Sequence, residues 1–155
     1  MIIPRQTVSD ALYALLKSIT FPALPTGQTT WAFTSTHWRS WADTSNQPAM
    51  YLVGPVNEDV SQDKRGLNRY DLQYMLWVYA QVNYNDLNAD PMKQVCNPIL
   101  DAIDTALAPD PATEYQNLGL PQVANARIKG KIEVCDGSID GQAVISLDVH
   151  DYVGS

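Results

Sequence analysis

The chain has 155 residues, of which 45% are hydrophobic and 17% charged, and its formal net charge is −7 at pH 7. This length suits one domain, residues 1–155, and the composition is typical of globular proteins and not of disordered or fibrous ones. The negative charge argues against a general nucleic-acid coat, because such binding relies on Lys and Arg to neutralise many phosphates.

The first expected element is an amphipathic helix over residues 8–19, where apolar side chains recur at helical spacing until Phe21-Pro22 forces an exit. The next stretch, residues 22–47, is rich in Pro, Thr and Ser but contains four aromatic residues. That is too aromatic for a solvated linker. We predict a short strand around Trp31 and a packed loop.

A short strand is expected over residues 50–53, ended by Gly54-Pro55. The polar stretch that follows, residues 57–68, is predicted to be an exposed, mobile loop that becomes ordered on binding a partner. Its charged side chains are the candidate partner-binding residues: Glu58, Asp59, Asp63, Lys64 and Arg65.

The longest period-two pattern covers residues 69–82 and predicts a strand. Its second face is also apolar in the middle, at Met75, Trp77 and Tyr79, so both faces of this strand need cover. Two sources of cover remain open. One is the tryptophan-rich segment 31–41 of the same chain, and the other is a second copy, which implies an oligomer.

A second amphipathic helix is expected to begin at Asp90-Pro91 and to end at Ala108-Pro109, with a kink at Pro98. Alternating apolar residues then predict strands over residues 124–134 and 143–149.

A hairpin loop over residues 136–141 would join these last two strands. The order of helix, strands, helix and two strands predicts an α+β domain. We expect a mixed or antiparallel sheet of about four to five strands with two helices packed on one face.

Arg127, Lys129 and Lys131 alternate along one face of a predicted strand, which places three basic side chains in a row on an acidic protein. A solvated strand face is one interpretation. The other is that the row faces a neighbouring subunit or a channel that carries DNA, where a polyanion or an acidic partner offsets the repulsion.

The candidate metal and catalytic sites lack the residue spacing that their chemistry requires. Asp136, Ser138 and Asp140 match the first half of a calcium loop, but Leu147 stands where the bidentate carboxylate is required. Nothing around His37 marks an activated serine, and no GxGxxG, GxxxxGK or HExxH motif occurs. We therefore expect no catalytic residue, no metal site and no cofactor.

The two cysteines, Cys96 and Cys135, show no CxxC spacing, so free thiols are expected. The N-terminus lacks a basic segment followed by an apolar run, and no stretch approaches the roughly 18 apolar residues of a membrane helix. Cytoplasmic synthesis without membrane insertion is the expectation.

Several phrases in the second half of the chain fall in a fixed order. They are ILDAID at 99–104 with ALAPDP at 106–111, QNLG at 116–119, IKGKI at 128–132 and DGQAVI at 140–145. Together they resemble the tail terminator, or tail-completion, proteins of long-tailed bacteriophages. In that family an LDAI…ALxPDP helix end precedes a QxLGG turn, an IxG strand and a strand entered by DGQAVA. Here Leu120 replaces the second glycine of the turn.

The resemblance is strong over residues 99–149 and implies a non-enzymatic structural protein of the virion. Such a protein forms a ring, usually of six copies, that caps the tail tube, stops its polymerisation and presents the head-joining surface. The implied partners are further copies of the chain, the tail tube protein and a neck or connector protein, with DNA passing transiently through the ring. The implied location is the tail and neck of the virion, assembled in the host cytoplasm, without membrane contact.

Two alternatives remain open. One is a head-tail connector or stopper of the neck, because such proteins share small α+β folds and ring symmetry. The other is a small soluble enzyme or ligand-binding domain with an aromatic pocket among Trp31, Trp38 and Trp41.

Overall fold

A computed structural model describes residues 4–22, 28–37, 49–62, 66, 68–79, 97–121, 123–128, 133–134 and 140–150, with the backbone alone for Tyr79, Ile128, 133–134 and 140–150. The elements are α1 (Arg5–Lys17), β1 (Phe33–Ser35), β2 (Ala49–Gln62), β3 (Asn68–Tyr79), α2 (Asn97–Ala106), β4 (Val123–Ile128), β5 (Glu133–Val134) and β6 (Asp140–His150).

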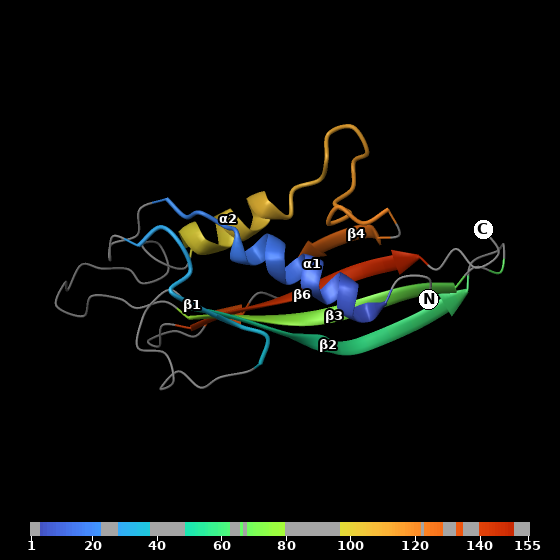
Figure 1. The fold of residues 1–155 in the computed structure, drawn as a ribbon, viewed down its shortest axis with the longest axis horizontal. Helices are drawn as coiled ribbons and strands as arrows, with labels where there is room; N and C mark the ends of the chain where they lie inside the picture. Colours follow the sequence, from blue (N-terminus) through green and yellow to red (C-terminus); the bar gives the residue numbers. More distant parts are fainter. Residues whose placement is uncertain are drawn as a thin grey trace.

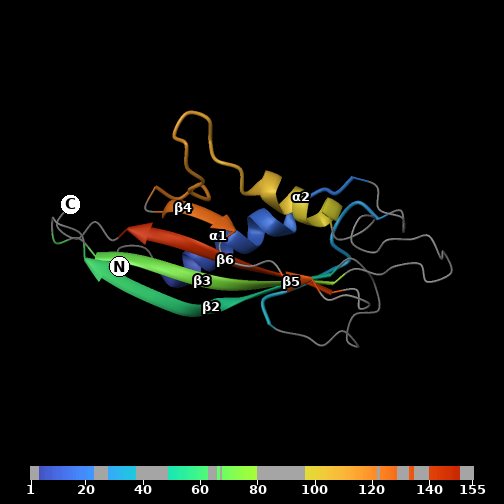
Figure 2. The ribbon, with the colours of Figure 1, turned by 180° about the vertical axis from the view of Figure 1, so that it is seen from behind.

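The described strands form one mixed sheet in the order β1-β2-β3-β6-β4, and β5 pairs with β6. The β1–β2 pair is parallel and the other pairs are antiparallel. Figures 1 and 2 show both helices on the same face of this sheet. The predicted α+β class is confirmed. The described sheet has six strands, against about four to five predicted, because two short strands, β1 and β5, join it.

The main core lies between the helices and the sheet. Alternate residues of β3 point into it, since the even-numbered positions from Leu72 to Val78 are buried. The helices contribute residues at helical spacing. The fully buried members from the two helices are Val8, Leu12, Leu16, Ile99 and Ile103.

Trp31 completes this core beyond the end of α1. Its ring packs edge-on against Phe21, with 4.5 Å between the ring centroids, and its indole N–H donates a 2.7 Å hydrogen bond to the carbonyl of Leu16. The strand expected around Trp31 begins two residues later, at Phe33. Trp38 and Trp41 lie outside the described residues, as do both cysteines and the predicted helix start at Asp90-Pro91.

The predicted loop over residues 57–68 is wrong for Glu58 and Asp59, which lie in β2. Gly54-Pro55 does not end the strand. The register with β3 shifts between Val53 and Asn57 and pairing then continues to the end of β2, so the two residues mark a bulge. The other candidate loop residues, Asp63, Lys64 and Arg65, lie outside the described part.

Smaller corrections concern the second half of the chain. Pro98 lies in the first turn of the described helix α2, where a missing N–H costs little. The predicted kink there stays a prediction, because residues 91–96 lie outside the described part. β6 begins at Asp140, which places Asp140 and Gly141 in the strand and not in the hairpin loop. A register shift between Val123 and Asn125 also makes Val123 a buried residue of β4 together with Ala126.

Candidate assembly surfaces

Of the basic row Arg127, Lys129 and Lys131, only Arg127 lies among the described residues. Ala126 is buried under the helices, so its neighbour Arg127 projects from the opposite sheet face and is exposed. Lys129 and Lys131 lie outside the described residues. Within the described part, Arg127 is the arginine without an ion-pair partner, because Arg5 bonds Glu58 and Arg69 bonds Asp71.

The second apolar patch is partly covered by this chain itself. Ala49 and Tyr51 of β2 are fully buried on the sheet face that is turned away from the helices, and Trp77 packs against them half-buried. Phe33 of β1 stacks its ring obliquely on Tyr51, with 5.6 Å between the centroids. Met75 is also half-buried, and the side chain of Tyr79 is not described. Cover within the chain therefore accounts for the Tyr51 end of this face.

Acidic residues line up at the other end of the same face. Asp59 of β2, Asp71 of β3 and Asp148 of β6 occupy one cross-strand row of the register. Like charges directly opposite one another destabilise a sheet. Arg69 offsets part of this repulsion, because its Nε lies 3.1 Å from a carboxylate oxygen of Asp71. Asp59 is exposed at the outer strand of the row.

Helix α1 is attached by an ion pair to the outer half of β2, residues 57–62. The Nε of Arg5 donates to the two carboxylate oxygens of Glu58, at 2.9 and 3.0 Å. This hydrogen bonding raises the pKa of Arg5 above its ordinary value. The guanidinium also lies over the ring of Tyr70, 5.7 Å from its centroid. Glu58 is therefore engaged within the chain, and its predicted role in partner binding stays a prediction.

Gln116 connects the end of α2 with β4. Its side-chain amide donates to the carbonyls of Ala106 and Ala108 at 3.3 and 3.0 Å, which satisfies carbonyls that a helix end leaves free. Its backbone carbonyl accepts a 2.8 Å bond from the N–H of Ala126, and its own N–H donates to Asn125 at 3.2 Å. The first residue of the QNLG phrase is thus a structural link between helix and sheet.

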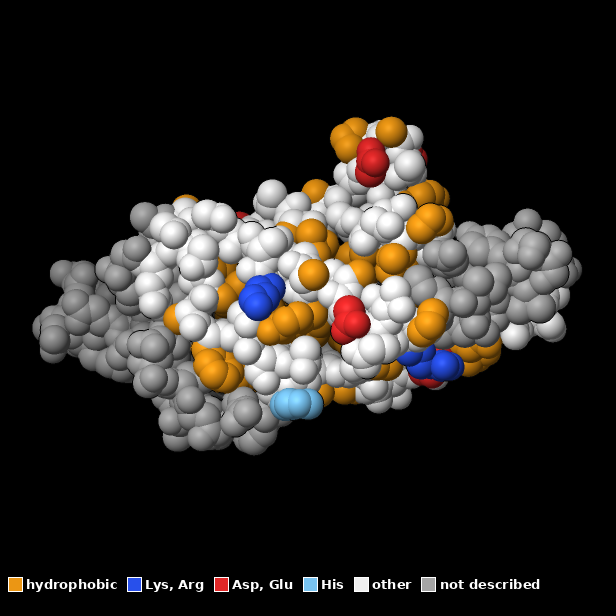
Figure 3. Space-filling view, in the orientation of Figure 1, with side chains coloured by type: hydrophobic (Ala, Val, Ile, Leu, Met, Phe, Trp, Pro, Cys, Tyr) orange, Lys and Arg blue, Asp and Glu red, His pale blue; other side chains and the backbone are white. Residues whose placement is uncertain are grey.

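The loop between α2 and β4 projects from the molecule (Figures 1 and 3). It is ordered by Asp110, whose carboxylate accepts from the N–H of Ala112 at 2.8 Å and whose carbonyl accepts from Glu114 at 2.7 Å. Glu114 has φ 64°, a costly value for a residue with a Cβ. Tyr115, 57% exposed, follows it. The loop holds an exposed aromatic ring beside Gln116 and hence beside the outer edge of β4.

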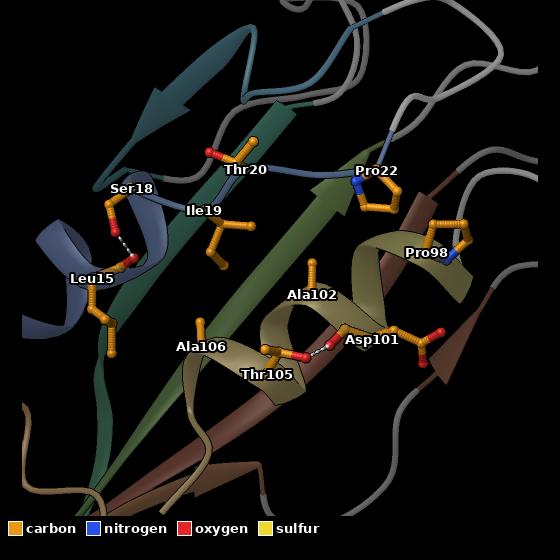
Figure 4. A pocket seen from close by; sticks show the side chains of 10 residues that line it. All are labelled: Leu15, Ser18, Ile19, Thr20, Pro22, Pro98, Asp101, Ala102, Thr105 and Ala106. Atoms are coloured by element: carbon orange, nitrogen blue, oxygen red, sulfur yellow. Dashed lines mark hydrogen bonds between the residues drawn. The ribbon is translucent and has the colours of Figure 1, made fainter. Parts of the chain in front are cut away.

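A groove of about 620 Å³ runs between the end of α1 and α2. Figure 4 shows Ala102 and Ala106 of α2 pointing towards Ile19 across it. The hydroxyls at its rim are used locally, since Ser18 donates to the carbonyl of Leu15 and Thr105 to that of Asp101. The lining is mainly apolar and offers few groups for orienting a polar substrate.

A smaller polar cavity of about 290 Å³ is lined by Ser9, Asp10, His37 and Tyr74, among others. Ser9 Oγ lies 2.7 Å from the hydroxyl of Tyr74 and 3.1 Å from the carbonyl of Arg5. Burial raises the pKa of Tyr74 above its ordinary value, partly opposed by the bond to Ser9. Both hydroxyls are engaged in tying α1 to β3, which is a structural role.

Among the described residues, no group of three or more His, Cys, Asp or Glu side chains is placed to hold a metal ion. Within the same part of the chain, no helix is long and apolar enough to cross a membrane. The comparison with known proteins finds no matching family model and no matching curated protein.

Proposed function

We propose that this chain is a non-enzymatic structural subunit of the virion, a tail terminator that forms a ring on the finished tail tube. The observation that carries the proposal is the ordered series of phrases over residues 99–149, each of which resembles a phrase of the terminator family. The α+β fold is compatible with this role. Function in such a protein lies in surfaces and not in a reaction centre.

The structural use of the phrases supports the same proposal. Gln116 of QNLG ties α2 to β4, and Gly119 of the same phrase has φ 74°, a turn conformation that favours glycine. The strand entered by Asp140 lies between β3 and β4 in the sheet. The described residues of these phrases therefore belong to one connected framework of helix, turn and sheet, which a family would share as a unit.

In the proposed assembly, copies of the chain close into a ring, usually of six. One ring face contacts the tail tube protein and the other a neck or connector protein, while DNA passes through the lumen. A contact between two different surfaces of the same chain is heterologous, and it closes into a ring when the rotation between copies fits. The assembled protein belongs to the tail and neck of the virion.

The test is to add the purified protein to polymerising tail tube protein and to measure tube length and end occupancy by electron microscopy. We expect tubes of limited length with a ring at one end, and capped tubes that join filled heads. A parallel binding measurement uses the isolated neck connector. Binding to the connector without any binding to tubes would contradict the terminator role and favour a neck stopper.

A further inference from the structure

The outer half of β2, residues 57–62, forms an edge of the described sheet. β1 pairs only with Ala49 to Tyr51, so the strand beyond the bulge has β3 on one side and no described strand on the other. Figures 1 and 2 both show this half of β2 at the margin of the sheet. Exposed edges invite pairing with another chain, and proteins usually blunt them with charged side chains, above all lysine, with proline or with a bulge. Residues 57–62 contain no lysine or proline, and of their two charges Glu58 is paired with Arg5 while Asp59 is exposed.

Both apolar and acidic side chains are exposed along this edge of β2. Val56 and Val60 are 46% and 57% exposed, on the sheet face where Glu58 meets α1. Asp59 projects from the opposite face and is exposed at the end of the acidic row. The edge thus offers apolar surface on one face and a carboxylate on the other.

The opposite edge of the sheet, at β4, exposes a basic and an aromatic side chain that complement the acidic and apolar side chains of the β2 edge. Arg127 is exposed on the same sheet face as Asp59, and the exposed ring of Tyr115 lies beside the Gln116 that follows the outer edge of β4. Three of the four exposed large hydrophobic residues in the described part are Val56, Val60 and Tyr115. Both opposite edges therefore combine one exposed charge with exposed apolar surface.

Asp59 and Arg127 cannot meet within one chain. They lie on β2 and β4, with β3 and β6 between them, so strand spacing alone separates them by about 14 Å. In the sheet, β2 and β4 also run in opposite directions. When the β4 edge of one copy approaches the β2 edge of another with the sheet faces aligned, the two strands are antiparallel and the two charges share a face.

We infer that the outer half of β2 is the docking surface for the β4 edge of a second copy, with an ion pair between Asp59 and the partner's Arg127. The contact covers Val56 and Val60 with the partner's Tyr115. Gln116 already bonds the N–H of Ala126, so the contact at that end of β4 is made by side chains. The inference rests on the proposed function only for the closure of these head-to-tail contacts into a ring.

A charge swap tests this contact in the full-length protein. Sedimentation velocity over a range of concentrations measures the association midpoint of wild type, Asp59→Arg, Arg127→Asp and the double variant. We expect each single reversal to raise the midpoint about tenfold or more, and the double variant to recover most of the loss. Raising the salt concentration should weaken wild-type association as well.

Asp104→Arg is the matched control, because Asp104 is an exposed carboxylate on a helix, α2, and not on a strand of the sheet. It should leave the midpoint unchanged, and circular dichroism should show that all variants keep the wild-type fold. A wild-type protein that stays monomeric up to about 1 mM overturns the inference. So does association that neither single reversal weakens. Assemblies that obey the charge swap but do not cap tail tubes overturn the proposed function and leave this contact standing.

Discussion

The segment from α2 to β4 and the outer half of β2 differ in how they satisfy their polar groups. In the first, Gln116 alone joins two helix-end carbonyls, the N–H of Ala126 and the side chain of Asn125 within the chain. In the second, Asp59 and two valines are exposed at a sheet edge. Gln116 and its partners are satisfied within the chain, while the second region offers groups to a partner. Substitutions at Gln116 and its partners should therefore change folding, and those at the outer half of β2 should change association.

The largest expected effect on folding is that of a cavity beneath α2. Ile103 is fully buried, so Ile103→Ala should lower the free energy of unfolding by about 2–5 kcal/mol. Val60→Ala, at a residue 57% exposed, should change it by less than about 0.5 kcal/mol while weakening association. Urea denaturation of both variants at low protein concentration measures the difference. Equal losses in the two variants would contradict the contrast between the regions.

Gly54 marks the boundary between the covered and exposed halves of β2. It has φ 139°, and an added Cβ would lie 3.0 Å from the ring of Tyr74 and from the backbone nitrogen of Val56. We expect Gly54→Ala to destabilise the fold by about 1–3 kcal/mol in thermal denaturation. Gly119→Ala is the control, since Gly119 has φ 74° but nothing within 4 Å, and it should cost about 1 kcal/mol. A smaller loss at Gly54 than at Gly119 would show that the close contact with Tyr74 is unimportant.

The link at Gln116 can be cut with little change in size. Gln116→Glu keeps the length of the side chain but replaces the amide donors with oxygen, so the carbonyls of Ala106 and Ala108 lose their partner. The expected loss is about 1–3 kcal/mol, measured by chemical denaturation. Asn117→Asp serves as the control, because Asn117 uses its side-chain oxygen as an acceptor for the N–H of Gly119. If both variants lost the same stability, the donor role of Gln116 would be disproved.

The smallest effect is a pH dependence at Tyr74. Because the pKa of Tyr74 is higher in the folded than in the unfolded chain, its contribution is fully present below the unfolded value of about 10 and is lost as the pH rises through the folded pKa. Tyr74→Phe should remove the bond to Ser9, at a cost of about 1 kcal/mol near neutral pH, and flatten the alkaline loss. Denaturation curves between pH 7 and 11 test this. If Tyr74→Phe lost stability with rising pH as steeply as wild type, the ionisation of Tyr74 would not be the cause of the alkaline loss.

Periodic elements were predictable from the sequence because their pattern is local. The alternation over residues 69–82 and the helical spacing over 8–19 gave a strand and a helix close to β3 and α1. These predictions required only that apolar side chains meet a core at the period of the element.

The outer half of β2 was not predictable in this way. Gly54-Pro55 and the charges after it resemble a turn and a loop, whereas the strand there is held by pairing with β3 and by the bond from Arg5 to Glu58. Both interactions depend on residues far away along the chain. Val56 and Val60 are four positions apart and so share a strand face, but the polar residues around them hide this alternation in the sequence.

The candidate site was predicted only in part. Arg127 is exposed on the sheet face away from the helices, whereas the proposed roles of Lys129 and Lys131 stay predictions. Asp59 was singled out as a charged loop residue, yet its position on a strand edge follows from the register with Asp71. Gln116 belonged to a recognised phrase, but its bonds to α2 and β4 are visible only in the fold.

The bond from Ala126 to the carbonyl of Gln116 has a consequence for the newly made protein. An outward-facing backbone N–H on an edge strand is a template for indiscriminate β aggregation. Gln116 occupies that donor from within the chain, so the β4 edge cannot extend into a fibre from this point. The side chains around it stay exposed, so a partner at this edge would be selected by shape and charge and not by backbone pairing.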